Sequence, residues 1–397
     1  MRIRWKYISQ YLLTLSCFVL LFKDILPGSL DQVLMILLAG LTLIHNRWKI
    51  VKDHAIIWYG VYVIFSFIVT LYTSSSFAYF TTICFSFIVI YTVTQNMRYN
   101  EDLIHFLKMY AYFGVLFCTY LIIVYHDKFG LTRFGNNGML TGTKIDSSIS
   151  LSYYLISICC VLIYVISEEQ RWRVKTLLLI GLCECSLLIL FSGVRKAILV
   201  PVLFYVMYMF RRNKKHVIRL FKYAAVLVLV LMVGIKLINI IPGLNRNLGD
   251  RLLTLVSSFS SLSSDSSISE RVRLAITGLQ LFYEHVFFGF GFDQTFNYFR
   301  ASHNGLSHPH NNYILLLDIG GIAFFLSYYW GHIKVIVSGL KRYIKLPYEQ
   351  AIILYYVILT LFSDFGTASY NIVFYNLFIG IGLCMYRLRK EDKCEQS

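Results

Sequence analysis

Hydrophobic residues fill runs of about 20 positions along almost the whole chain, and short polar segments separate the runs. A run of that length spans the hydrocarbon layer of a bilayer, where only a helix or a closed barrel satisfies its own backbone hydrogen bonds. The pattern predicts an all-α polytopic integral membrane protein with about 12 transmembrane helices. Their expected bounds are 10–26, 30–45, 55–72, 77–94, 103–125, 148–167, 174–191, 194–210, 220–241, 311–337, 350–365 and 370–387.

Composition supports this interpretation. The 397 residues are 57% hydrophobic and only 15% charged, whereas soluble domains are about a quarter charged. A net charge of +16 raises the question of nucleic-acid binding, but the positive residues follow membrane topology instead. Lys and Arg concentrate in every second connection, as cytoplasmic loops do. These connections are 2–6, 47–52, 171–175, 211–222, 341–345 and 387–393. We therefore expect both termini in the cytoplasm and no nucleic-acid partner.

The cysteines and the start of the chain carry no other signal. None of the nine cysteines forms a CxxC pair, and all except Cys394 lie in apolar segments. They are expected to be small buried hydrophobes, neither disulfides nor metal ligands. The start, MRIRWKY, is basic and has no cleavage pattern after it, which is typical of a retained signal anchor.

Two expected outer connections, 126–147 and 242–310, are longer than a turn requires. The second divides the chain into helices 1–9 (1–241), an extracytoplasmic catalytic loop (242–310), and helices 10–12 with a cytoplasmic tail (311–397). Within that loop, 270–287 has apolar residues near helical spacing and predicts an amphipathic helix at the membrane surface, with Ser269 as its N-cap.

The long outer loop uses arginine alone as its basic residue. Its five arginines are Arg246, Arg251, Arg271, Arg273 and Arg300, and no lysine occurs between Lys236 and Lys334. A guanidinium binds phosphate oxygens through two parallel hydrogen bonds, so this loop suits a diphosphate or an acidic sugar. The alternative is that the charges are solvated or contact anionic lipid headgroups. For Arg246 and Arg300 the two interpretations are about equal, whereas for Arg271 and Arg273, on a surface helix, a role in function is favoured.

Other polar residues are candidates with open alternatives. Arg195, in FSGVRKA, is expected at the outer end of the eighth helix, where it either acts on substrate or reaches water. In SHPHNNYILLL, His308, His310, Asn311 and Asn312 lie just before the tenth helix. A histidine there can accept a proton near neutral pH, or the cluster simply caps the helix. A third metal ligand of clear spacing is missing from the sequence around this pair.

Two acids inside predicted helices and a glycine-rich segment have more than one interpretation. Glu184 and Asp318 fall inside predicted helices, where acids are either functional or paired with a neighbouring helix. The GFGF sequence at 289–292 is weak as a phosphate motif and is better interpreted as a tight turn that leaves the amphipathic helix.

Taken in order, FSGVRKA, ERVRLAITGLQLFYEHVFFGFG and HPHNNYILLLDIGG resemble the signature region of the O-antigen ligase and polymerase superfamily. The resemblance is close over about 190–325. The family's helix arginine falls on Arg195, its loop arginine on Arg271, its His-Asn pair on His310 and Asn311, and its acid-x-Gly on Asp318. The chain departs from many members at Val194, often Ser, and at Val286, often Pro; neither change removes a charge.

The resemblance implies an inverting glycosyltransferase of the bacterial inner membrane that needs no metal or other cofactor. Its donor would be an undecaprenyl-diphosphate-linked glycan, and its acceptor a sugar hydroxyl. His310 would be the base, Arg271 and Arg195 would stabilise the leaving diphosphate, and Arg273, Arg251, Arg246, His308 and Asn311 would bind substrate. Membrane lipids, a chain-length regulator and a flippase are the expected partners.

Among functions, we predict a polymerase of O-antigen or capsule repeat units. The first alternative is an O-antigen ligase that transfers polymer to a lipid A core or another acceptor. A flippase or other transporter of lipid-linked oligosaccharides is the alternative from another class, but its charges would follow a path through many helices, whereas here they gather on one side.

Overall fold

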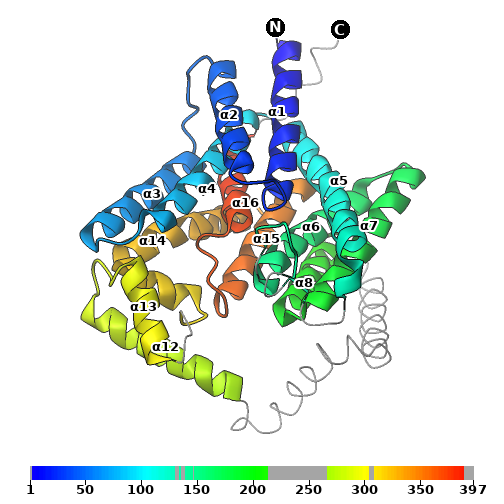
Figure 1. The fold of residues 1–397 in the computed structure, drawn as a ribbon. Helices are drawn as coiled ribbons and strands as arrows, with labels where there is room; N and C mark the ends of the chain where they lie inside the picture. The colour runs from blue at the N-terminus through cyan, green and yellow to red at the C-terminus, as the bar shows by residue number, and fades with distance from the viewer. Residues whose placement is uncertain are drawn as a thin grey trace. The chain divides into compact units, whose positions relative to one another are not determined.

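A computed structural model describes residues 2–129, 134–135, 139–145, 147–212, 266–303 and 308–388 (Figure 1). In these ranges the chain is built from helices joined by turns. The helices are α1 (Arg2–Phe22), α2 (Leu30–His45), α3 (His54–Tyr72), α4 (Phe77–Asn96), α5 (Asn100–Tyr125), α6 (Ser148–Glu168), α7 (Trp172–Ser192), α8 (Arg195–Arg212), α12 (Ser266–Glu284), α13 (Phe292–Ser302), α14 (Asn312–Lys341), α15 (Tyr348–Asp364) and α16 (Val373–Cys384).

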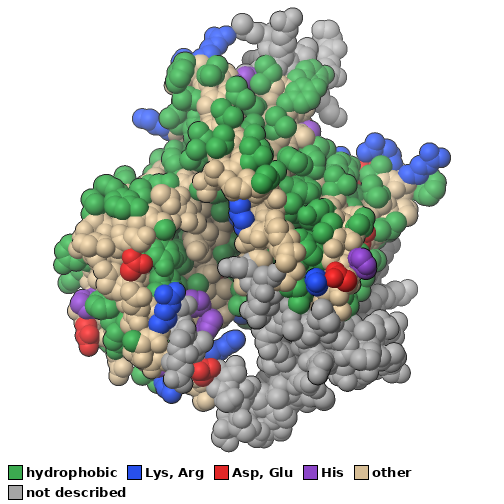
Figure 2. Space-filling view, in the orientation of Figure 1, with side chains coloured by type: hydrophobic (Ala, Val, Ile, Leu, Met, Phe, Trp, Pro, Cys, Tyr) green, Lys and Arg blue, Asp and Glu red, His purple; other side chains and the backbone are tan. Residues whose placement is uncertain are grey.

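Six of the described helical segments are long and apolar enough to cross a membrane. They are His54–Tyr72, Phe77–Asn96, Asn100–Lys128, Ser148–Glu168, Trp172–Ser192 and Asn312–Lys341, and three shorter apolar helices accompany them. Large apolar side chains stay exposed along α2 and α3, where Figure 2 shows them as broad hydrophobic areas, as a lipid-facing surface requires. The chain is therefore a polytopic membrane protein. The count of about 12 spans stays a prediction, and the ninth predicted helix, 220–241, lies outside the described residues.

The chain separates into two compact units. The first contains Met1–Ser16, Gln32–Ile104 and Asp265–Ser397, and the second contains Cys17–Asp31 and His105–Ser264. In the first unit α3 packs on α14, where the Trp58 indole donates to the Tyr328 carbonyl over 2.9 Å and covers Gly331. In the second unit α6 packs on α5 at Gly114, and α7 packs on α5 at Gly181.

Most predicted helices are confirmed within two or three residues, and the exceptions have physical causes. The first helix is Arg2–Phe22 instead of 10–26, because helical hydrogen bonding continues into the basic start and a turn closes after Phe22. The amphipathic helix is Ser266–Glu284 instead of 270–287. Ser269 lies inside it, so the N-cap prediction is wrong.

The helix α13 was not predicted, since Phe292–Ser302 carries too many polar residues to resemble a span. It lies beside α12 in Figure 1. Leu274 and Leu281 of α12 form a buried apolar cluster with Phe299 of α13, and Phe290 packs against it. The two helices thus form a small folded element outside the long apolar helices.

The long helix α14 is broken about a third of the way along, at Gly321, whose φ of 67° and ψ of −167° are not helical. The chain between α12 and α13 fills the break. Phe290 N donates to the Asp318 carbonyl (2.6 Å), Gly291 N to the Ile319 carbonyl (2.9 Å), and Ile322 N to the Val286 carbonyl (2.9 Å). Backbone groups that the break would leave without partners are therefore satisfied. The GFGF segment is a structural junction, in keeping with its interpretation as a turn.

Candidate functional site

The turn that enters α14 holds both predicted histidines. His308 Nδ1 accepts a hydrogen bond from His310 N over 3.1 Å, and the two rings meet edge to face with centroids 4.3 Å apart. His310 has a φ of +51°, which is uncommon for a residue with a side chain. Asn311 is the N-cap of α14, and its side chain accepts from Tyr313 N and Ile314 N. The turn is thus fixed by local hydrogen bonds, and the capping alternative holds for Asn311.

The neutral form of the His308 ring accepts the hydrogen bond from the backbone of His310. The His308 ring is packed against Phe296, with centroids 6.4 Å apart. Burial first, and then the neighbouring charge of His310, lower the pKa of His308 to about 4. At neutral pH its Nδ1 therefore keeps the lone pair that receives the His310 amide. His308 serves the backbone of the turn, and its predicted contact with substrate stays a prediction.

The packing of α12 on α14 relates Arg271 to this turn. Space for a Cβ at Gly278 is occupied by Ile314 Cγ2 and Asp318 Oδ2, at 2.4 and 2.8 Å, so the helices touch there. The chain after α12 meets α14 further along, at residues 318–322, so the two helices run in the same direction. Arg271 precedes Gly278 by two helical turns. The contacts at Ile314 and Asp318 lie within two turns of the start of α14 at Asn312. The part of α12 that carries Arg271 therefore extends towards the end of α14 that holds the histidine turn.

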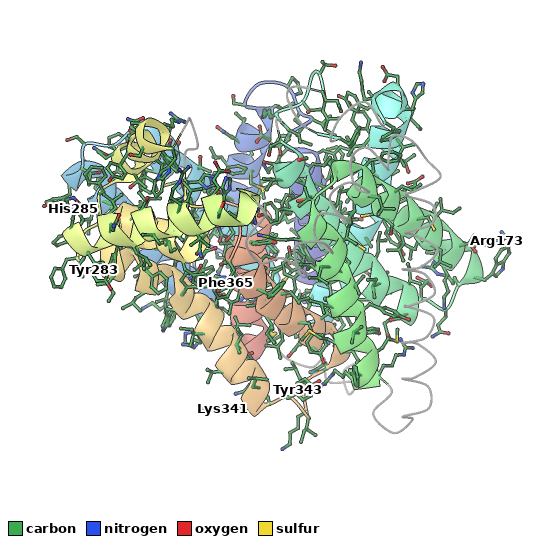
Figure 3. All side chains as sticks on the ribbon, turned by 90° about the horizontal axis from the view of Figure 1, so that it is seen from below. Arg173, Tyr283, His285, Lys341, Tyr343 and Phe365 are labelled. Atoms are coloured by element: carbon green, nitrogen blue, oxygen red, sulfur yellow. The ribbon has the colours of Figure 1, made fainter. Side chains whose placement is uncertain are left out.

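Arg271 and Arg273 do not share a face of α12. Residues two apart on a helix point about 200° apart. Arg271 lies on the side that carries Gly278 and faces α14, whereas Arg273 lies on the opposite flank. Both are exposed. Between them runs an exposed apolar stripe, made of Val272, Ile276, Leu279 and Tyr283. Figure 3 shows Tyr283 pointing away from the neighbouring helices. The helix is amphipathic, as predicted, and of the two arginines Arg271 is the one on the side of α12 that carries Gly278.

The predicted arginines do not all belong to one compact unit. Arg195 begins α8, directly after a turn in which Gly193 adopts a left-handed φ of 65°. It belongs to the second unit, whereas Arg271 and His310 belong to the first. Arg246 and Arg251 lie outside the described residues. Their roles at the site stay predictions.

The two intramembrane acids have different surroundings. Glu184 of α7 accepts a hydrogen bond from the Thr119 hydroxyl of α5 over 2.7 Å, which is the structural pairing considered above. Asp318 of α14 is fully buried against Gly278, and neither carboxylate oxygen has a hydrogen-bond partner within the described part of the chain. Its backbone carbonyl holds the junction at Phe290. No sets of three His, Cys, Asp or Glu side chains positioned for a metal occur in the residues described.

The sequence interpretation missed a second buried acid, Asp364, at the end of α15. It joins Asn312, Tyr329 and Ser369 in a hydrogen-bond network directly behind the histidine turn. The feature of the sequence that could have pointed to Asp364 is its position as an acid at the end of the apolar predicted span 350–365. Asn312 is visible in the sequence as part of the cluster before the tenth helix, but its partners are not.

Comparison with known families gives a match. Residues 177–329 match the family described as O-antigen ligase, and this segment contains Arg195, Arg271 and the histidine turn. The match supports the resemblance to the O-antigen ligase and polymerase superfamily, which covers O-antigen ligases and related membrane enzymes. A search of curated proteins gives no match.

Proposed function

We propose that this chain is an inverting glycosyltransferase that polymerises undecaprenyl-diphosphate-linked repeat units at the outer face of the bacterial inner membrane. The observation that supports the proposal is the packing of α12 on α14 at Gly278 and at the junction beyond it, from which we infer that the guanidinium of Arg271 lies on the side of the His310 imidazole. The family match over residues 177–329 supports the reaction class.

The chemistry fits these two groups. The acceptor hydroxyl attacks the anomeric carbon, the bond to the diphosphate oxygen breaks, and the configuration at that carbon inverts. His310 accepts the hydroxyl proton, and the diphosphate leaves with the bonding electrons. Negative charge develops on the leaving oxygen, so a fixed guanidinium lowers the barrier. Arg271 supplies that charge, and Arg195 is the second candidate.

A lipid donor also explains why the site belongs to a membrane protein. The stripe Val272, Ile276, Leu279 and Tyr283 is apolar and exposed, which suits a helix lying in the interfacial layer of a bilayer. From there Arg271 can meet a diphosphate at headgroup depth, while the polyprenyl chain stays in hydrocarbon. The many aromatic side chains, 17% of the chain, favour a glycan-specific polymerase.

The test is a glycan gel of a deletion strain. A polymerase predicts single repeat units attached to the carrier or the core. Polymer that accumulates unattached on the carrier would identify a ligase instead. Normal ladders from both His310→Ala and Arg271→Ala strains, with the proteins present in the membrane, would refute the site.

A further inference from the structure

Behind the histidine turn lies a buried network of polar side chains. Apolar side chains of similar size would cost less free energy to bury there. Its members are Asn312 of α14, Tyr329 of α14, Asp364 of α15 and Ser369 of the α15–α16 connection, and each is at most 3% exposed. Burying four polar side chains is costly unless every group finds a partner. Such networks add little stability over apolar packing. They do restrict geometry, and this one adjoins the proposed base.

The hydrogen bonds fix the orientation of the Asn312 amide. Its Oδ1 accepts from Ser369 N (2.9 Å) and Tyr370 N (3.0 Å), so its Nδ2 must face the other way. There Nδ2 donates to the Tyr329 hydroxyl over 2.9 Å and reaches Asp364 Oδ2 at 3.5 Å. One residue, directly after the N-cap, thus joins the start of α14 to the connection beyond α15.

The two hydroxyl groups of the network, those of Tyr329 and Ser369, both donate to Asp364. Tyr329 accepts from Asn312 and donates its hydroxyl proton to Asp364 Oδ2 over 2.8 Å. The Ser369 hydroxyl donates to Asp364 Oδ1. The carboxylate is therefore the final acceptor of a directional chain, next to Phe365, which Figure 3 labels. A side chain with an N–H at position 364 would place donor against donor.

We infer that Asp364 and Asn312 are positioning residues for His310. The inference rests on the proposed function. Asn312 is two residues from His310, and the turn between them is already held by His308 at its other end. With both ends anchored, the His310 backbone keeps its positive φ, and the imidazole keeps one position relative to the acceptor hydroxyl. Misplacing a base by about 1 Å can cost on the order of a hundredfold in rate.

An exchange of the two side chains tests the inference. In Asp364→Asn the new amide N–H opposes Tyr329 and Asn312, and in Asn312→Asp two carboxylates face each other. The double variant N312D/D364N restores the hydrogen bonds described above, with those at Tyr329 reversed: the aspartate at 312 accepts from Ser369 N, Tyr370 N, Tyr329 and the asparagine at 364, and that asparagine also donates to the Tyr329 hydroxyl and accepts from Ser369. Thr360→Ala is the matched control, since within the described ranges the buried Thr360 hydroxyl of α15 donates to the Val357 carbonyl of its own helix and takes no part in the network.

The assay uses purified full-length protein with lipid-linked repeat unit extracted from the deletion strain, and it reports kcat and the donor KM per folded molecule. We expect each single variant to lower kcat about tenfold or more with KM unchanged, and the double variant to recover most of it. If a single variant fails to fold, Ser369→Ala, which removes one donor, gives the kinetic reading.

Wild-type kcat per folded molecule in the single variants, or a double variant as slow as either single one, would overturn the inference. Wild-type protein that turns over no lipid-linked repeat unit would instead refute the proposed function, so the two failures are distinct.

Discussion

At the residue scale, the two arginines of α12 are expected to contribute unequally to transfer, although they are close neighbours in the sequence. Arg271 lies on the α14 side and Arg273 on the opposite flank. We expect Arg271→Ala to lower transfer by about 10²–10³-fold, the cost of losing one fixed donor to developing charge. Arg273→Ala should cost about fivefold or less, as an exposed charge does. Repeat-unit transfer by equal amounts of membrane protein measures both. Equal losses would show that the register argument is wrong.

His308 provides a prediction about pH. Its pKa of about 4 in the folded protein lies below the ordinary 6.5 of an unfolded chain. Between these values the unfolded state binds a proton that the folded state does not, so the free energy of unfolding falls as pH drops from 6.5 to 4. Above pH 6.5 the contribution is fully present.

The variant His308→Asn isolates this effect, because its amide oxygen can still accept from His310 N but cannot titrate. Thermal unfolding in detergent should show that the wild type loses more stability than the variant between pH 7 and pH 4.5. Carboxylates titrate in the same window, and comparing the two proteins cancels them. Parallel pH profiles would mean that His308 is not held neutral.

At the scale of elements, hydrophobic periodicity was enough for most of the helices but not for their joints. Bounds of α2, α3 and α6 follow from where apolar runs begin and end. The break at Gly321 and helix α13 could not be predicted. In the sequence, the broken helix α14 is one continuous apolar run. The short polar helix α13 has the composition of a loop, and only the packing of Phe299 in the structure distinguishes it.

The same limit applies to the site. The types and order of Arg271, His310 and Asn311 are visible in the sequence, and these residues were singled out. Their relation depends on Gly278 touching α14, a contact between residues more than 30 positions apart. Asp364 was overlooked because its partners, Asn312 and Ser369, come from other segments. No periodicity within one helix records that pairing.

The junction between α12 and α14 carries a prediction of its own. Gly289 has a φ of +66°, and a Cβ there would lie 2.4 Å from backbone atoms of Ile319 and Gly320. We expect Gly289→Ala to destabilise the protein by about 3 kcal/mol, from the left-handed backbone and the clash together. Gly60→Ala is the control, because nothing lies within 4 Å of that position in α3 and alanine favours the helix by up to about 1 kcal/mol. Thermal unfolding in detergent compares them. Equal melting temperatures would contradict the tight junction.

At the scale of the whole molecule, the proposal depends on which side of the membrane holds α12. The positive residues of the connection after α14, Lys341, Arg342 and Lys345, predict that this end of α14 is cytoplasmic. Helix α14 (Asn312–Lys341) continues for 20 residues after its break at Gly321, which is about 30 Å of helix and enough to cross the hydrocarbon layer. Its first residue, and with it the histidine turn and α12, should then lie outside.

Two exposed positions allow this orientation to be measured. Gln280 of α12 is exposed and lies on the face of Arg273, outside the apolar stripe, and Ile344, in the connection after α14, is 86% exposed. In spheroplasts, a membrane-impermeant thiol reagent should label Gln280→Cys and should label Ile344→Cys only after the membrane is opened. The parent chain, with its own nine cysteines, is the blank. The reverse pattern would place Arg271 and His310 in the cytoplasm, away from a donor presented at the outer face, and no rearrangement within one unit could rescue the proposed reaction.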